Sequence, residues 1–214
     1  MTRIKCCGMT RVEDALLAAQ LGADAIGLVF TARSKRQVSL EQARAIRHAL
    51  PPFVDAVALF MDDDAAFVAD VIAAVQPDLL QFHGSEPDAW CARFGRRYLK
   101  AIAMGEGAAA LPRLREYPGA AALLLDGHAA GEAGGGGKAF DWSLLPRDPA
   151  QPVILAGGLH ADNVGAAIRA ARPWAVDVAS GVESAPGIKD AAKLAGFVAA
   201  VRAADRESAP PTDR

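Results

Sequence analysis

Two adjacent cysteines stand near the start of the chain, in the segment KCCGMT over residues 5–10. Side chains alternate along a strand, so Lys5 and Cys7 share one face while Cys6 lies on the other. A cation beside a thiol favours the thiolate, which can act as a base or a nucleophile. The spacing therefore predicts a reactive Cys7 with a lowered pKa, and a Cys6 that packs as a small buried residue. The alternative for Cys7 is an inert buried thiol.

A carboxylate, Asp126, closes the apolar segment AALLLD over residues 121–126. At the end of such a strand a carboxylate caps a loop, forms an ion pair or transfers protons. The strand count places Asp126 across from Cys7, and we therefore expect it to be a general acid or base.

Glycine-bearing loops follow two further apolar runs, in LAGGLHADN (155–163) and ASGVES (179–184). Bare backbone amides and helix N-termini are groups that bind phosphate. One such loop alone indicates only a turn, but two neighbouring loops predict a phosphate site. The residues that we assign to it are Gly157, Gly158, Ser180 and Gly181.

A basic triplet in SKRQVS (34–39) offers Arg36, whose guanidinium can bind a planar carboxylate through two parallel hydrogen bonds. The alternative is a solvated loop. His83 in QFHG and Asp177 in AVDVAS also end apolar runs. We predict no metal site, because no second histidine or carboxylate lies near His83 at ligand spacing. His128, in a glycine-rich segment, receives no role.

These candidates follow short apolar runs that alternate with amphipathic helical patterns. Such alternation is typical of parallel strands covered by helices. Eight runs in 214 residues predict a single-domain (β/α)8 TIM barrel, whose active site lies at the carboxyl ends of the strands. An open doubly wound sheet is the alternative, but the first run is not followed by a GxGxxG turn. The runs are RIKCC (3–7), AIGLVF (25–30), FVDAVALF (53–60), DLLQF (78–82), YLKAIA (98–103), AALLLD (121–126), PVILAG (152–157) and AVDVAS (175–180).

Two helix starts carry the signature of a capping box. In this motif a hydroxyl and a carboxylate or amide three residues later satisfy free N–H groups of the first turn. Thr10 with Glu13, and Ser39 with Gln42, have the required spacing.

The barrel is expected to occupy residues 1–204 as the catalytic domain, and residues 205–214 to form a polar, disordered tail. The segment DGHAAGEAGGGGK (126–138) resembles a linker in composition. A boundary there would leave six strands on one side and two on the other, and neither set closes a sheet. We therefore predict a long loop after the sixth strand.

Composition narrows the classes of partner. Lys and Arg number 23 and Asp and Glu number 25, for a net charge of -2, so no broad basic field attracts nucleic acid or an anionic membrane. The first residues contain no charged segment followed by an apolar run, and no apolar run approaches a bilayer span. The three cysteines match neither a disulfide framework nor a paired CxxC zinc site. We expect a cytoplasmic protein with reduced thiols and small-molecule partners; the sequence does not indicate its oligomeric state.

Taken in order, KCCG, SKRQVS, QFHG, LLLD, GGGGKAFDW, LAGGLHADNV and VDVASGVESAPGIKD resemble the phosphoribosylanthranilate isomerases over almost the whole chain. The resemblance implies a TIM barrel that needs no cofactor. It also implies an Amadori rearrangement of N-(5-phosphoribosyl)anthranilate to 1-(2-carboxyphenylamino)-1-deoxyribulose 5-phosphate in tryptophan biosynthesis.

The resemblance assigns roles to the candidate residues. It implies that Cys7 is the general base, that Asp126 is the general acid and that Arg36 holds the anthranilate carboxylate. His83 and Asp177 are expected to contact the substrate. The four residues Gly157, Gly158, Ser180 and Gly181 fall on the phosphate-binding loops of the family. The chain departs from the family pattern at Gly136, where Ser or Thr is common, and at Phe82, where Leu is commoner.

Three other functions fit a barrel with a phosphate site. An indole-glycerol-phosphate synthase needs a lysine-rich catalytic set, and a pentose-phosphate epimerase needs histidine metal ligands on several strands. Lys5 and His83 do not supply these sets. A non-catalytic phosphosugar-binding protein has no reason to keep both Cys7 and Asp126 at strand ends.

Overall fold

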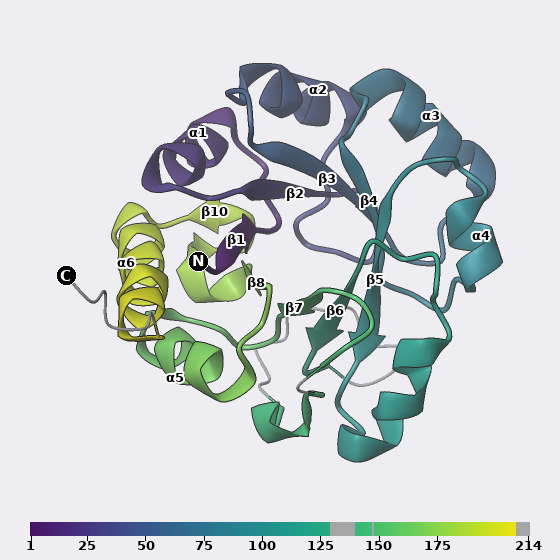
Figure 1. Cartoon of the computed structure of the whole chain (residues 1–214). Coiled ribbons are helices and arrows are strands. Elements are labelled where there is room, and N and C mark those ends of the chain that lie inside the picture. Colours follow the sequence, from purple (N-terminus) through teal and green to yellow (C-terminus); the bar gives the residue numbers. More distant parts are fainter. Residues whose placement is uncertain (129–139, 147, 209–214) are drawn as a thin grey trace.

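The computed structural model describes residues 1–128, 140–146 and 148–208. Its parallel strands β1 to β8 form a closed barrel in chain order (Figure 1), which confirms the predicted TIM barrel. Each strand lies within the predicted apolar run or coincides with it. The strands are β1 (Arg3–Cys6), β2 (Ala25–Val29), β3 (Asp55–Phe60), β4 (Leu79–Phe82), β5 (Tyr98–Ala103), β6 (Ala122–Asp126), β7 (Val153–Leu155) and β8 (Ala175–Val178).

Helices surround the barrel as an outer layer (Figure 1). A short antiparallel hairpin of β9 (Glu183–Ala185) and β10 (Ile188–Lys189) follows β8. No helix in the described part of the chain is long and apolar enough to cross a membrane. The helices are α1 (Val12–Leu21), α2 (Leu40–Ala49), α3 (Ala65–Val75), α4 (Asp88–Ala92), α5 (Ala161–Ala171) and α6 (Ala191–Ser208), with 3-10 helices η1 (Gly107–Arg115), η2 (Trp142–Leu144) and η3 (Ser180–Val182).

The two predicted capping boxes differ in outcome. Ser39 and Gln42 form the reciprocal hydrogen bonds of the motif at the start of α2. Helix α1 instead begins after Arg11, which makes no side-chain cap. The Thr10 hydroxyl instead donates to the carbonyl oxygen of Gly187, far away in the sequence, at 2.5 Å. The prediction of a capping box at Thr10 was therefore wrong.

Helix α6 is longer than predicted and helps to close the barrel. It continues past Ala204 to Ser208, because Asp205 is anchored to the start of the chain. The Asp205 carboxylate accepts hydrogen bonds from the backbone N–H of Thr2 at 2.9 Å and from its hydroxyl at 2.7 Å. The rest of the predicted tail, 209–214, and most of the predicted loop after β6, 129–139, lie outside the described residues.

The two cysteines at the end of β1 point into different layers, as strand alternation predicts. Cys6 is fully buried in the apolar core between strands and helices. Cys7 belongs to a small cluster with Val29 and Leu59 at the mouth of the barrel. The register of β1 therefore turns Cys7, and not Cys6, toward the ends of the neighbouring strands.

We predict that Cys6→Ser lowers the free energy of unfolding by about 1 to 3 kcal/mol, because it buries a hydroxyl among apolar side chains. Cys7→Ser is the matched control and is expected to cost less, since Cys7 borders the open mouth. Urea unfolding monitored by circular dichroism measures both values. An equal or larger loss for Cys7→Ser would contradict this register.

Candidate active site

A cavity opens at the carboxyl ends of the strands. It brings together residues that lie far apart in sequence, and Gly181 is the one predicted site residue that does not line it. The predicted residues along its wall are Cys7, Arg36, His83, Asp126, Gly157, Gly158, Asp177 and Ser180.

A buried ion pair lies beside Cys7. Lys5 on β1 and Asp177 on β8 are register partners, and Lys5 Nζ lies 3.0 Å from Asp177 Oδ1. Burial lowers the pKa of Lys5, but the charges of Asp177 and Cys7 raise it above its usual value. Burial also raises the pKa of Asp177, against the opposing effect of Lys5. Lys5 therefore stays an ammonium inside the barrel.

The pKa of the Cys7 thiol differs from the prediction. Burial raises this pKa, and the charge of Lys5 lowers it by a smaller amount, so the net shift is upward. Only 6% of Cys7 is exposed, a depth that the sequence does not reveal. The expected cation is present, but the expected lowered pKa was wrong.

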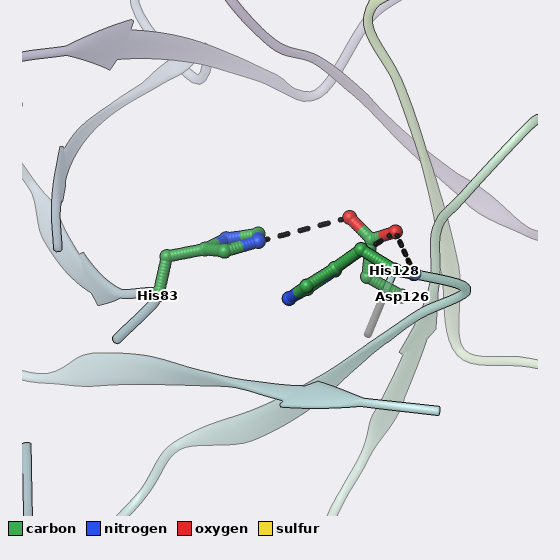
Figure 2. A group of neighbouring side chains, drawn as sticks. All are labelled: His83, Asp126 and His128. Atoms are coloured by element: carbon green, nitrogen blue, oxygen red, sulfur yellow. Dashed lines mark hydrogen bonds and ion pairs between the residues drawn. The ribbon is translucent and has the colours of Figure 1, made fainter. Parts of the chain in front are cut away.

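Asp126 ends β6, and its carboxylate lies beside two histidines (Figure 2). His128 donates its backbone N–H to Asp126 Oδ1 at 3.3 Å, and its ring Nδ1 lies 3.2 Å from the same oxygen. His83, directly after β4, places Nε2 at 3.8 Å from Asp126 Oδ2. The two imidazole rings stack with centroids 4.8 Å apart. The structure thus gives His83 the neighbours that sequence spacing did not show.

Burial and contacts act in opposite directions on these groups. Burial raises the pKa of Asp126, but the contact with His128 and, in the acid range where the rings are charged, the nearby His83 and His128 lower it below its usual value. Burial lowers the pKa of His83 to about 4, despite the nearby carboxylate of Asp126. At neutral pH His83 is therefore an uncharged ring.

The same three side chains are the set that comes closest to a metal site in the described part of the chain. Their ligand atoms all lie within 4.8 Å of one another. They are two imidazole nitrogens and a carboxylate oxygen, a ligand set that zinc accepts. The absence of a metal site stays a prediction.

Arg36 enters the cavity from the loop after β2, and its orientation is set by Glu183. Arg36 Nε and Nη2 donate to the two carboxylate oxygens of Glu183 at 2.8 and 2.7 Å. Burial raises the pKa of Glu183, but Arg36 and Lys189 lower it below its usual value. One edge of the guanidinium fork is therefore occupied by a protein carboxylate, and the Nη1 edge remains for a ligand.

Lys189, on β10, joins this clamp to the other loops of the mouth. Its ammonium donates to the Glu183 carboxylate at 2.9 Å, to the Cys7 carbonyl oxygen at 2.7 Å and to the Ala179 carbonyl oxygen at 3.1 Å. One buried cation thus connects the residue after β1, the loop after β8 and the partner of Arg36.

The glycine loops after β7 and β8 lie against each other. Gly157 and Gly158 have φ values of 86° and 64°, a region that favours glycine. A Cβ on Gly181 would lie 2.0 Å from the Leu159 carbonyl oxygen. Gly181 therefore serves the close approach of the two loops, which explains why it does not line the cavity.

Of the two departures from the family pattern, Phe82 does not line the cavity. Phe82 is fully buried and stacks between Phe60 and Phe94 on the helix side of β4. Gly136 lies outside the described residues.

Sequence reasoning missed Glu183, His128 and Lys189, and Lys189 carries no local signal. No local motif surrounds Glu183. The only indication in the sequence is that an acidic residue follows the eighth strand, at the same end of the barrel as the basic SKR triplet. The glycine-rich sequence around His128 gives it no predicted role, yet the side chain is buried, with 6% of its surface exposed. Its position two residues after a strand-ending aspartate is the signal that could have found it.

Known proteins share this architecture. The family model of N-(5'-phosphoribosyl)anthranilate (PRA) isomerase matches residues 4–200. The N-(5'-phosphoribosyl)anthranilate isomerase of Pseudomonas paraeruginosa is 53% identical over 207 residues, covering 97% of this chain and 98% of the relative.

Solved structures agree with the sequence comparison. The crystal structure of phosphoribosyl anthranilate isomerase from Thermotoga maritima has a TM-score of 0.86 and 42% identity, and the match covers 95% of this chain and 100% of that chain. A phosphoribosyl anthranilate isomerase in complex with reduced 1-(o-carboxyphenylamino)-1-deoxyribulose 5-phosphate has a TM-score of 0.81 and 38% identity, with the same coverage. A family match of this extent, on a barrel whose mouth holds Cys7 and Asp126, means that the chain belongs to the N-(5'-phosphoribosyl)anthranilate isomerase family.

Proposed function

We propose that this chain converts N-(5'-phosphoribosyl)anthranilate to 1-(2-carboxyphenylamino)-1-deoxyribulose 5-phosphate with Cys7 as general base and Asp126 as general acid. The observation that carries the assignment is that Cys7 and Asp126, at the ends of β1 and β6, line one cavity. The activity is that of the family, an isomerisation in tryptophan biosynthesis.

The first step needs an acid. Asp126 donates a proton to the furanose ring oxygen while the anthranilate nitrogen lone pair expels that oxygen, and the sugar opens to a Schiff base. A positioned acid of this kind contributes about a hundred- to ten-thousand-fold in rate.

The second step needs a base. The Cys7 thiolate removes the proton from the carbon next to the Schiff base, and the resulting enolamine tautomerises to the ketone. Because burial raises the pKa of Cys7, only a small fraction is thiolate at neutral pH. That thiolate is a correspondingly strong base.

The remaining residues hold the substrate at its two charged ends. Backbone N–H groups of Gly157 and Gly158 make no hydrogen bond to other described residues, which leaves them for the phosphate. Ser180 adds a hydroxyl on the facing loop. Arg36, oriented by Glu183, binds the anthranilate carboxylate through its outer edge. Fixing both ends keeps the reacting carbons between the acid and the base.

The wider role of these residues follows the same proposal. Asp177 keeps Lys5 beside Cys7, and with His83 it borders the substrate. No cofactor is required by proton transfers between side chains. The solved relative in complex with reduced 1-(o-carboxyphenylamino)-1-deoxyribulose 5-phosphate supports a small-molecule phosphoribosyl partner. The cytoplasmic location stays a prediction from the sequence.

We predict that Cys7→Ser lowers kcat by about a hundred- to ten-thousand-fold, because an alcohol is a far weaker base than a thiolate. The loss of phosphoribosylanthranilate fluorescence measures turnover, and the parent protein must accelerate it. Cys6→Ser, which faces the helices, is the control and keeps parental activity per folded molecule. A product analogue should shield Cys7 alone from a thiol alkylating reagent, and protection of Cys6 instead would contradict the assignment.

Asp126→Asn is expected to reduce turnover by a comparable factor, about a hundredfold or more, since the amide keeps the shape but delivers no proton. Affinity for reduced product should change little, because the phosphate and carboxylate contacts remain. Calorimetric titration and turnover on the same preparation separate the two effects. Substantial activity in this variant would remove Asp126 from the acid role.

Arg36→Met should raise KM by about tenfold or more while kcat changes less, because a carboxylate clamp acts in both ground and transition states. Glu183→Gln is the matched variant: it leaves the guanidinium in place but loosens its orientation, and a smaller rise in KM is expected. Steady-state kinetics give both parameters. A change confined to kcat in Arg36→Met speaks against the clamp.

A further inference from the structure

Gln81 is a buried amide on the cavity wall that the proposed mechanism leaves without a role. It belongs to β4 and precedes His83 by two residues, so the two side chains share the face that lines the cavity. Gln81 Nε2 lies 3.1 Å from His83 Nδ1. We propose that Gln81 holds His83 as the tautomer that carries its proton on Nε2, and that this N–H donates a hydrogen bond to the furanose oxygen of the substrate, an inference that rests on the proposed function.

The contact with Gln81 decides which ring nitrogen of His83 carries the proton. An amide nitrogen donates hydrogen bonds and accepts none, so His83 Nδ1 has to be the acceptor. Burial lowers the pKa of His83 to about 4, which leaves the ring with one proton at neutral pH. That proton is therefore on Nε2. The ring also stacks on His128, with planes 25° apart, so its orientation is fixed (Figure 2).

Two buried polar atoms of this pair have no hydrogen-bond partner in the part of the chain that the structure describes. They are Gln81 Oε1 and His83 Nε2. Gln81 is 1% exposed and His83 is 9% exposed, so water reaches neither side chain freely. A buried polar group without a partner destabilises a folded protein, and such groups therefore point to a function. Both side chains line the cavity, where the oxygen atoms of a bound sugar would supply the partners.

The position of His83 Nε2 selects the substrate atom. It lies 3.8 Å from Asp126 Oδ2, which is too far for a direct hydrogen bond (Figure 2). A single oxygen atom placed beside both groups can lie about 2.8 Å from each of them. In the proposed reaction the oxygen that contacts Asp126 is the furanose oxygen. His83 and Asp126 would therefore contact the same substrate atom.

The hydrogen bond from His83 strengthens as the sugar opens. While the bond between the anomeric carbon and the furanose oxygen breaks, its electrons move to the oxygen and Asp126 supplies the proton. His83 keeps its own proton and stabilises the negative charge that develops on that oxygen. In the product the same oxygen is the 4-hydroxyl, which donates to the Asp126 carboxylate and accepts from His83. The other tautomer would turn a nitrogen lone pair toward a furanose oxygen that has no proton to donate.

Nitrogen NMR measures the tautomer directly. In the parent protein at neutral pH, His83 should show a proton on Nε2 and none on Nδ1, and the signals are assigned by their loss in His83→Phe. Gln81→Met keeps the length of the side chain but removes the amide, so the His83 ring should then populate both tautomers. A proton on Nδ1 in the parent overturns the proposal, and so does an unchanged tautomer in Gln81→Met.

Turnover tests the effect on the reaction. We expect kcat to fall by about tenfold or more in both His83→Phe and Gln81→Met, because the lost hydrogen bond is strongest in the transition state. Gln151→Met is the matched control, since the Gln151 amide donates to the Tyr117 carbonyl oxygen at 2.6 Å and does not line the cavity. It should keep parental kinetics. A parental kcat in His83→Phe would remove His83 from the ring-opening step.

Binding identifies the substrate atom without relying on turnover. Reduced product and its 4-deoxy analogue differ only in the oxygen that His83 would contact, and calorimetric titration gives both affinities. The ratio of these affinities should shrink by about threefold or more in His83→Phe and in Gln81→Met, and should stay parental in Gln151→Met. An unchanged ratio in His83→Phe assigns the hydrogen bond to another atom and overturns the inference.

The parent protein separates the two proposals. If it neither binds reduced product nor turns over phosphoribosylanthranilate, the proposed function itself fails. If it does both while the affinity ratio and kcat are parental in His83→Phe and Gln81→Met, only the role of the Gln81 and His83 pair is refuted.

Discussion

The ion pair of Lys5 and Asp177 is the contact on which the mouth of the barrel depends. It joins β1 to β8, where the first and last strands of the barrel meet, and Lys5 is only 3% exposed. Removing two charges from water costs several kcal/mol per ion, and only a close partner repays it. The pair therefore ties barrel closure to the environment of Cys7. The charge that is paired across the two closing strands also lowers the pKa of Cys7, the proposed base.

Much of this fold can be predicted from the sequence, because short local patterns indicate the strands and the faces of their side chains. Strand alternation separated Cys6 from Cys7 correctly, and the eight apolar runs predicted every barrel strand. What failed depends on distant partners. The Thr10 hydroxyl bonds to Gly187, and the pKa of Cys7 follows from burial that no spacing encodes. The contact of Arg36 with Glu183 also spans two loops with no common motif. The assignments of acid, base and phosphate loops came from the family resemblance and strand ends, and they stay predictions.

The pKa of Cys7 is raised and the pKa of Asp126 is lowered. A base that is already deprotonated in the free protein would need a lowered pKa, and an acid that is already protonated would need a raised one. Burial favours the neutral thiol of Cys7, and the histidines favour the carboxylate of Asp126. The form ready for reaction is then a minority of the free protein. As a thiolate Cys7 is a strong base, and as a neutral carboxyl Asp126 is a strong acid. In the proposed mechanism this strength compensates for the scarcity of both forms.

The contacts of Lys189 determine how long a chain segment must be if it is to be transferred from one related barrel to another. Its ammonium reaches back from the β9–β10 hairpin to the carbonyl oxygens of Cys7 and Ala179 and to the carboxylate of Glu183. If only the ASGVES loop were transferred from a related barrel, the glutamate at position 183 would come from the donor protein. Its partners Lys189 and Arg36 would still be those of the recipient protein. Residues 179–189 form the smallest segment that carries its own cation with it. A loop transplant between related barrels should therefore include the β9–β10 hairpin together with the loop after β8.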